Sequence, residues 1–133
     1  MSGTLASGFR AALGLLCTLS IAACGRQLSP SSALPMLEAE LRKPVREFCC
    51  SRIDHSAVRS RCESDAEAQC GFAASGTARV TNFSNMGHGD VAFGTFSVEG
   101  PRGKGTCEAQ FLRTDGSWFI STLSCRPAEP RAG

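Results

Sequence analysis

The chain has 133 residues, of which 42% are hydrophobic and 20% are charged, and its formal net charge at pH 7 is +2. A charge so close to neutral implies no strongly basic surface, so bulk electrostatics do not argue for binding of nucleic acid. The length predicts one small domain, and eight cysteines in so short a chain are typical of exported domains held together by disulfides.

The first 23 residues have the pattern of an export signal. Arg10 carries the one charged side chain, and residues 11–23 are apolar or small throughout. That run is shorter than the roughly 20 apolar residues that a membrane-spanning helix needs, so it fits the central region of a signal peptide. It ends in Ala22 and Ala23, small residues of the kind that a signal peptidase requires beside the cut.

The residues Ile21, Ala22, Ala23 and Cys24 resemble the lipobox of bacterial lipoproteins, in which an aliphatic and two small residues precede a cysteine. The resemblance implies cleavage before Cys24, a diacylglyceryl group on its thiol, and acylation of the new amine by a fatty acid such as palmitate. Two or more acyl chains give stable attachment, so the protein would be anchored to a membrane without spanning it. In that family aspartate after the cysteine favours the inner membrane. Gly25 stands here, which favours the outer membrane and a domain facing the periplasm. An ordinary cleaved signal and a retained short anchor are the alternatives.

Removal of residues 1–23 would leave 110 of the 133 residues, with one of the 14 Lys and Arg lost, all 12 Asp and Glu kept, and a net charge of +1. Cys17 would leave with the signal, and Cys24 would carry lipid. Six cysteines would remain, an even number that predicts a disulfide framework without saying which residues pair. These candidates are Cys49, Cys50, Cys62, Cys70, Cys107 and Cys125.

The remaining chain is expected to form a tether, one domain and a tail. Residues 24–32 contain one proline and three serines, which is typical of a short linker. The domain is expected over residues 33–126, and residues 127–133 are expected to form a flexible tail.

The first part of the domain predicts helices. Residues 33–50 place apolar side chains at helical spacings, with Ser32 as the expected N-cap and Pro35 in the first turn. Pro44 lacks a backbone donor and is expected to kink or restart this helix. A second helix is expected over residues 55–69. Asp54 would cap it, Gly71 would end it, and a capping box over residues 64–67 would allow it to break in two.

After Gly76 the apolar pattern alternates, which predicts strands joined by turns rich in Gly, Asn, Asp and Ser. Four strands are expected, over residues 77–83, 91–99, 106–113 and 118–125. Short connections predict an antiparallel meander. The predicted fold is therefore α+β: N-terminal amphipathic helices packed on a curved four-stranded antiparallel sheet and stapled by disulfides.

The last hairpin has two candidate registers. A three-residue turn over residues 114–116 places Cys107 and Cys125 on one face, a diagonal step apart, whereas a two-residue turn places them on opposite faces. We expect the three-residue turn, because it makes a Cys107–Cys125 bond possible. Bonds from these cysteines to the helices are the alternative.

Helices followed by a curled meander resemble the cystatin-like and nuclear-transport-factor-like group, in which a helix packs across a bent sheet. Residues 96–105 (FSVEGPRGKG), followed by a strand and residues 115–120 (DGSWFI), are similar to the cytochrome oxidase complex assembly family. That family joins its strands by a Gly-Pro-x-Gly-x-Gly turn and ends in a Gly-x-Trp strand. The resemblance implies a non-enzymatic assembly or scaffold module. It does not extend to the cysteine-rich helical region.

Three patterns in the sequence are candidates for chemical sites. His55 and the first four cysteines of the domain could hold zinc, but they contain no C-x-x-C pair, and an exported compartment favours disulfides over metal or free thiols. Residues 100–106 lack the glycine spacing of a phosphate loop and lead into a strand, so they predict a hairpin turn. His88 and Asp90 lack an identifiable nucleophile and orienting partner. No catalytic site, metal site or cofactor is therefore expected, apart from the lipid on Cys24.

The sequence thus predicts a membrane-anchored lipoprotein of the bacterial cell envelope with a structural, assembly or protein-interaction role. We expect another envelope protein as its partner, and neither enzymatic activity nor nucleic-acid binding. The alternative is a module that binds a small apolar ligand in a cavity between helix and sheet. Phenylalanines would line that cavity: Phe93, Phe96, Phe111 and Phe119.

Overall fold

The computed structural model describes residues 27–87 and 89–129. The predicted signal and Cys24 lie outside the described residues, as do His88 and residues 130–133. Within the described ranges, no helix is both long enough and apolar enough to cross a membrane.

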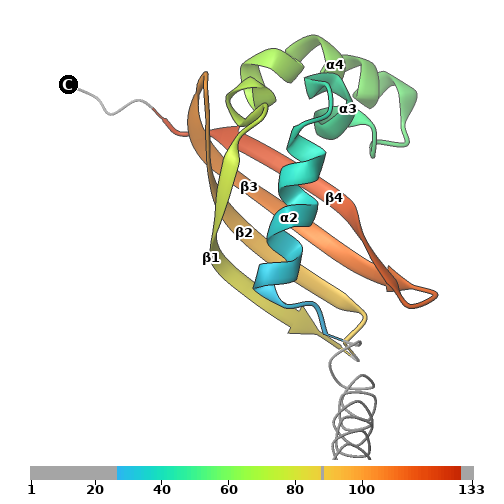
Figure 1. Ribbon diagram of the computed structural model, residues 1–133. Helices are drawn as coiled ribbons and strands as arrows, with labels where there is room; N and C mark the ends of the chain where they lie inside the picture. Colours follow the sequence, from blue (N-terminus) through green and yellow to red (C-terminus); the bar gives the residue numbers. More distant parts are fainter. Residues whose placement is uncertain (1–26, 88, 130–133) are drawn as a thin grey trace, which may run out of the picture.

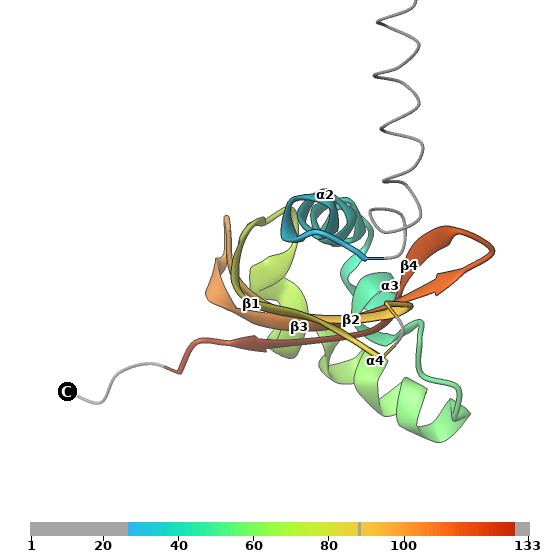
Figure 2. The same cartoon turned by 90° about the horizontal axis from the view of Figure 1, so that it is seen from below.

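The predicted α+β fold is confirmed. The helices are α2 (Pro30–Leu41), α3 (Val45–Cys50), α4 (Ser56–Cys70) and the short 3-10 helix η1 (Gly71–Ala73). The strands are β1 (Thr77–Met86), β2 (Val91–Gly100), β3 (Gly103–Thr114) and β4 (Ser117–Pro127), paired antiparallel in that order. Helix α2 lies across one face of the curved sheet, which we call the inner face, while α3 and α4 gather at one end (Figures 1 and 2). The opposite face is the outer face.

The hydrophobic core lies between α2 and the inner face of the sheet. Leu37 and Leu41 of α2 and Phe48 of α3 are fully or almost fully buried with Phe96 and Phe111 of the sheet. The rings of Phe96 and Phe111 meet edge to face, with their centroids 6.3 Å apart. Burying each such side chain contributes about 1.5–3 kcal/mol, so this layer is the main support of the fold.

The folded domain begins earlier than the sequence predicted. Leu28 is 4% exposed, and helix α2 starts directly after Ser29. The N-cap is Ser29, whose Oγ accepts a hydrogen bond from the backbone N–H of Ser32 at 3.1 Å, so the expectation that Ser32 caps the helix is wrong. The predicted tether over residues 24–32 therefore belongs to the fold from residue 28 onward.

Two prolines shape the first helices. Helix α2 ends at Leu41 and α3 starts at Val45, so the predicted restart at Pro44 is confirmed. Pro35 lies inside α2 and not in its first turn as expected. There it lacks the N–H that would complete one intrahelical hydrogen bond.

Helix α4 is one continuous helix of 15 residues, not two. Its N-cap is His55 and not Asp54, because Nδ1 of His55 accepts a hydrogen bond from Val58 N–H at 3.4 Å. The helix ends at Cys70, immediately before Gly71, as predicted. Two disulfides, one from the middle and one from the end of α4, join this helix to α3.

The last hairpin corrects the expected register. Strands β3 and β4 are joined by the two-residue turn Asp115–Gly116, and both residues have positive φ, 53° and 80°, as a type I′ turn requires. This turn alone would put Cys107 and Cys125 on opposite faces. Ser121 is an extra residue in β4 at the register shift, and it brings Cys125 directly opposite Cys107. The expected three-residue turn is wrong, but the shared face of the two cysteines is confirmed.

All six predicted cysteines form disulfides. The pairs, with their Cα–Cα distances, are Cys49–Cys70 (6.1 Å), Cys50–Cys62 (5.8 Å) and Cys107–Cys125 (4.1 Å). Helix α3 is thus linked twice to α4, and β3 is linked to β4. Each bond closes a loop of a size that stabilises a domain by roughly 3 kcal/mol in the chain-entropy account.

Candidate functional site

Helices α3 and α4 are held together by two disulfides. Together with η1 they form a unit that we call the helical cap (residues 45–73). The cap stands beside β4, the last strand of the sheet. A groove of about 340 Å³ separates the two. The cap contributes Cys49, Arg52, Ile53, Cys62, Gln69 and Cys70 to its lining, and β4 contributes Thr122, Leu123, Ser124 and Cys125.

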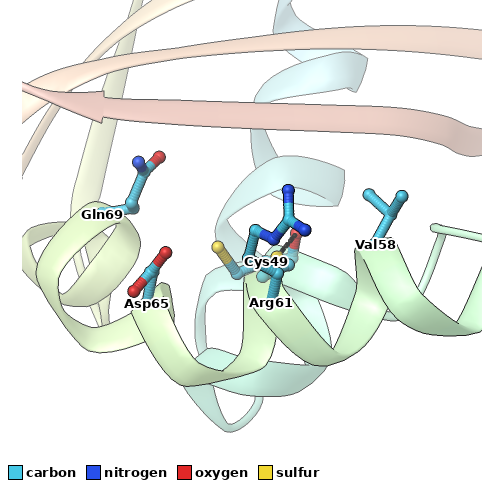
Figure 3. A pocket seen from close by; sticks show the side chains of 6 residues that line it. Cys49, Val58, Arg61, Asp65 and Gln69 are labelled. Atoms are coloured by element: carbon cyan, nitrogen blue, oxygen red, sulfur yellow. Dashed lines mark hydrogen bonds between the residues drawn. The ribbon is translucent and has the colours of Figure 1, made fainter.

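A second, smaller hollow of about 230 Å³ continues along α4 (Figure 3). It shares Cys49, Cys62 and Gln69 with the groove. Its other lining residues are Val58, Arg61 and Asp65, and Val58 is half exposed. The two hollows together make a surface of mixed apolar and polar character around a rigid, disulfide-bonded centre.

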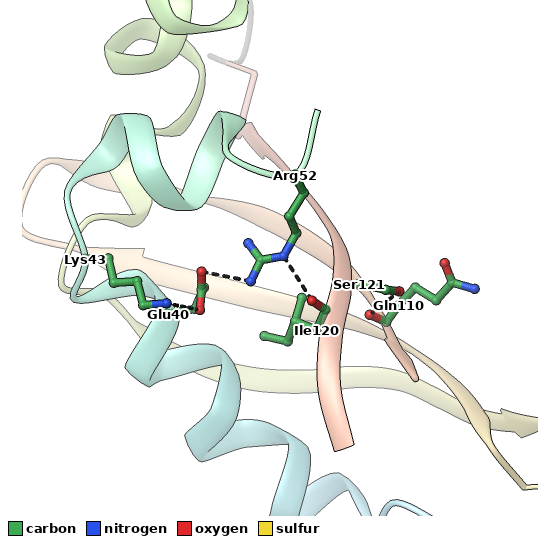
Figure 4. A network of polar contacts seen from close by, with 6 residues as sticks. All are labelled: Glu40, Lys43, Arg52, Gln110, Ile120 and Ser121. Atoms are coloured by element: carbon green, nitrogen blue, oxygen red, sulfur yellow. Dashed lines mark hydrogen bonds and ion pairs between the residues drawn. The ribbon is translucent and has the colours of Figure 1, made fainter. Parts of the chain in front are cut away.

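Arg52 holds one wall of the groove in place through a polar network (Figure 4). Its Nη2 lies 2.9 Å from Glu40 Oε1, and its Nε donates a hydrogen bond to the carbonyl oxygen of Ile120 at 3.0 Å. Lys43 Nζ lies 3.1 Å from Glu40 Oε2. The network therefore joins the end of α2, the segment after α3 and strand β4, the elements that position the groove.

The carboxylate at the centre of this network is ionised at neutral pH. Burial raises the pKa of Glu40, but hydrogen bonds from Lys43 and Arg52, with their charges, outweigh burial and leave the pKa below its ordinary value. Glu40 itself is 8% exposed. Because its folded-state pKa is depressed, its contribution to stability is present above its ordinary pKa and is lost as pH falls through the lower value.

The cysteines of the cap do not offer metal ligands in this structure. The sulfurs of Cys49, Cys50 and Cys62 lie within 4.8 Å of one another, but each is bonded to another cysteine in a disulfide. A metal needs a thiolate, which a disulfide sulfur does not supply. This confirms the interpretation of these cysteines as a disulfide framework.

The glycine-rich pattern at residues 100–106 is a hairpin turn that leads into strand β3, as predicted. Gly100 pairs with Gly103 across the two-residue turn between β2 and β3, and Arg102 in that turn makes an ion pair of 2.8 Å with Glu67. His88 lies outside the described residues. The carboxylate of the same pattern, Asp90, places its Oδ1 3.5 Å from Arg113 Nη1.

The four phenylalanines predicted to line an apolar cavity lie on different faces of the sheet. Phe96 and Phe111 are fully buried in the core, whereas Phe93 and Phe119 are 41% and 43% exposed on the outer face. They cannot line one cavity, because adjacent positions of a strand point to opposite faces. The expected lining of a ligand pocket is therefore wrong.

Sequence reasoning missed the groove and its support. The sequence did offer one signal. Glu40 lies three positions after Leu37 and directly before Leu41, on the buried side of α2. A carboxylate on the buried side of an amphipathic helix indicates an ion pair. Its partner Arg52 is twelve residues further along the chain, after helix α3. The sequence does not specify the direction of that helix, so this pairing could not be predicted.

No family model, curated protein or solved structure matches this chain. The resemblances to the lipobox and to the assembly family therefore stay predictions.

Proposed function

We propose that this chain is an exported lipoprotein of the bacterial cell envelope. It is anchored by lipid on Cys24, and its domain is a non-enzymatic assembly or interaction module. The observation that carries the proposal is that all six cysteines of the described residues are paired in disulfides. Such bonds persist in exported proteins and are rare in the cytosol. The other two cysteines of the sequence, Cys17 and Cys24, fall in the predicted signal and at the predicted cleavage site.

The start of the fold supports an anchor at this position. Leu28 N–H donates a hydrogen bond to Asn85 Oδ1, and Asn85 Nδ2 donates one to the Leu28 carbonyl oxygen, both at 3.0 Å. From Cys24 to Leu28 a fully extended chain spans at most about 14 Å. A lipid on Cys24 would therefore hold the end of β1 close to the bilayer.

Helix α2 then separates the anchored end from the helical cap. Its 12 residues run from the Leu28 end to the cap over about 18 Å (Figure 1). The helical cap, which forms one wall of the groove, would therefore lie at the end of the domain away from the anchor. We place the contact with an envelope protein partner in the groove, because its mixed lining suits a protein segment and its walls are fixed by disulfides and by the Arg52 network.

Metabolic labelling with a radioactive fatty acid tests the anchor. We expect the label on the wild-type chain in the producing bacterium and on Cys17→Ala, the matched control, because residue 17 would leave with the signal. Cys24→Ala should carry no label and should leave the membrane fraction. Equal labelling of Cys24→Ala and the wild type would refute the anchor.

Photo-crosslinking tests the contact. A photoreactive residue at Thr122, in the groove, should give one discrete adduct with an envelope protein in native membranes. The same residue at Thr77, on the opposite edge strand, is the control and should give none. An adduct that is equally strong from both positions would contradict a contact in the groove.

A further inference from the structure

The outer face carries an apolar row that crosses all four strands. Met86 pairs with Val91, Val91 with Leu112, and Leu112 with Phe119, so one side chain comes from each strand in turn. Met86 is 50% and Phe119 43% exposed, and Phe93, the next outward position of β2, is 41% exposed. Strand spacing makes the row about 14 Å long. We call these five residues the apolar row.

Within the strands of the outer face, the charged side chains lie away from the apolar row. Among the described residues of this face, the charged side chains belong to pairs nearer the cap: Arg79, Glu99, Lys104, Glu108 and Arg126. The pairs nearest the row contribute only uncharged partners, such as Ser84 and Gln110. Two acids, Asp90 and Asp115, lie in the turns at the edge of the row. The face is thus apolar at one end and charged at the other.

The apolar end is also the end at which the chain enters the fold. Asn85, which holds Leu28, is the neighbour of Met86 in β1. The helical cap lies at the other end of the sheet (Figure 1). Asn85 points to the inner face and Met86 to the outer face, so a lipid within about 14 Å of Leu28 would set the bilayer at the end of the sheet that carries the apolar row.

We propose that the apolar row docks on the lipid surface to which Cys24 anchors the chain. This inference rests on the proposed lipid anchor. Apolar side chains on the row would enter the interfacial zone, while the charged end of the outer face and the helical cap stay in water. The anchor lowers the cost of this contact, because it keeps the row at the surface at high effective concentration.

The size of the row favours lipid over a second copy of the chain. Five side chains, none more than half exposed, offer a few hundred Å², whereas a stable protein interface buries about 800 Å² on each partner. No basic cluster accompanies the row, so we expect docking that does not need anionic lipid and is insensitive to salt.

Depth-dependent fluorescence quenching tests the docking. Trp118 is the single tryptophan of the chain, so Trp118→Phe gives a background without one. In that background, Phe119→Trp places a probe on the row and Glu108→Trp places one on the charged end. The full lipidated chain is reconstituted in phosphatidylcholine vesicles with quenchers attached near the headgroups. We expect quenching and a blue-shifted emission for the probe at residue 119 and neither for the probe at 108.

Variants on the row provide the second readout. Met86→Glu, in the background that carries the probe at residue 119, should abolish quenching while the chain keeps its lipid and its disulfides. Equal quenching at residues 119 and 108 would overturn the docking, as would a crosslinked dimer through the row without quenching. Either result would overturn only the docking, provided that the fatty-acid label shows lipid on Cys24. Absence of the label would instead overturn the proposed function itself.

Discussion

Leu28 and Asn85 hold each other by two hydrogen bonds of 3.0 Å across 57 positions of sequence. The backbone of Leu28 uses both its N–H and its carbonyl in this contact, and its side chain is buried. The first described residues are therefore fastened to the end of β1, next to the apolar row. This contact fixes which end of the domain lies nearest to Cys24.

Asn85→Ala should loosen the start of the fold. Loss of two partly buried hydrogen bonds should lower the free energy of unfolding by about 1–2 kcal/mol, measured by urea denaturation. Hydrogen exchange should rise at the Leu28 amide, which loses its acceptor. Asn82→Ala, at an exposed position of the same strand, is the control and should change little. Equal effects of the two substitutions would show that the contact does not hold the N-terminal segment.

Glu40→Gln should destabilise the domain at neutral pH, because it removes the negative charge between Lys43 and Arg52. We expect a loss of about 2 kcal/mol, since Arg52 would keep a partly buried charge without its partner. Because the pKa of Glu40 is depressed, wild-type stability should fall as pH drops below about 4, and that fall should be smaller in the variant. Thermal denaturation from pH 7 to pH 3 measures both effects. Glu63→Gln, at an exposed position of α4, should behave as the wild type.

Double cysteine substitutions should give free-thiol counts that depend on whether the two replaced cysteines are bonded to each other. Cys50→Ser with Cys62→Ser removes one whole bond and should leave no free thiol among the cysteines of residues 27–129, at a cost of roughly 3 kcal/mol. Cys49→Ser with Cys62→Ser breaks two bonds and should leave two free thiols. Maleimide labelling followed by mass measurement counts them. The pairing would be contradicted by two free thiols in the first variant and none in the second.

Deletion of Ser121 should break the third disulfide. The deletion removes the extra residue of β4, so every position after it moves by one and Cys125 turns to the face opposite Cys107. Maleimide should then label both cysteines. Ser121→Ala keeps the register and should keep the bond. An intact bond in the deletion variant would mean that the bulge does not set the register.

The sequence predicted the type and order of the elements because periodicity reports which side chains are buried. The alternating pattern after Gly76 and the break at Pro44 are examples, and both are confirmed. Caps were less predictable. Ser29 and Ser32, like His55 and Asp54, are neighbouring residues that can each accept the capping hydrogen bond, and small differences in packing decide between them.

The strand register, the disulfide pairing and the apolar row could not be predicted from the sequence, because each depends on contacts between distant residues. One bulge at Ser121 changes the face of every later residue of β4, and no local signal distinguishes it from an ordinary strand position. The pairing of the cap cysteines depends on how α3 and α4 cross. The apolar row was visible only as scattered residues, because its members meet through strand register and not through spacing.

The intact mass of the chain extracted from membranes of the producing bacterium tests the central claim most directly. We predict a polypeptide whose first residue is Cys24. Its mass should be raised by a diacylglyceryl group and an amide-linked acyl chain and lowered by the hydrogens lost in three disulfides. A chain that keeps residues 1–23, begins at another residue, or carries Cys24 without lipid would contradict the claim.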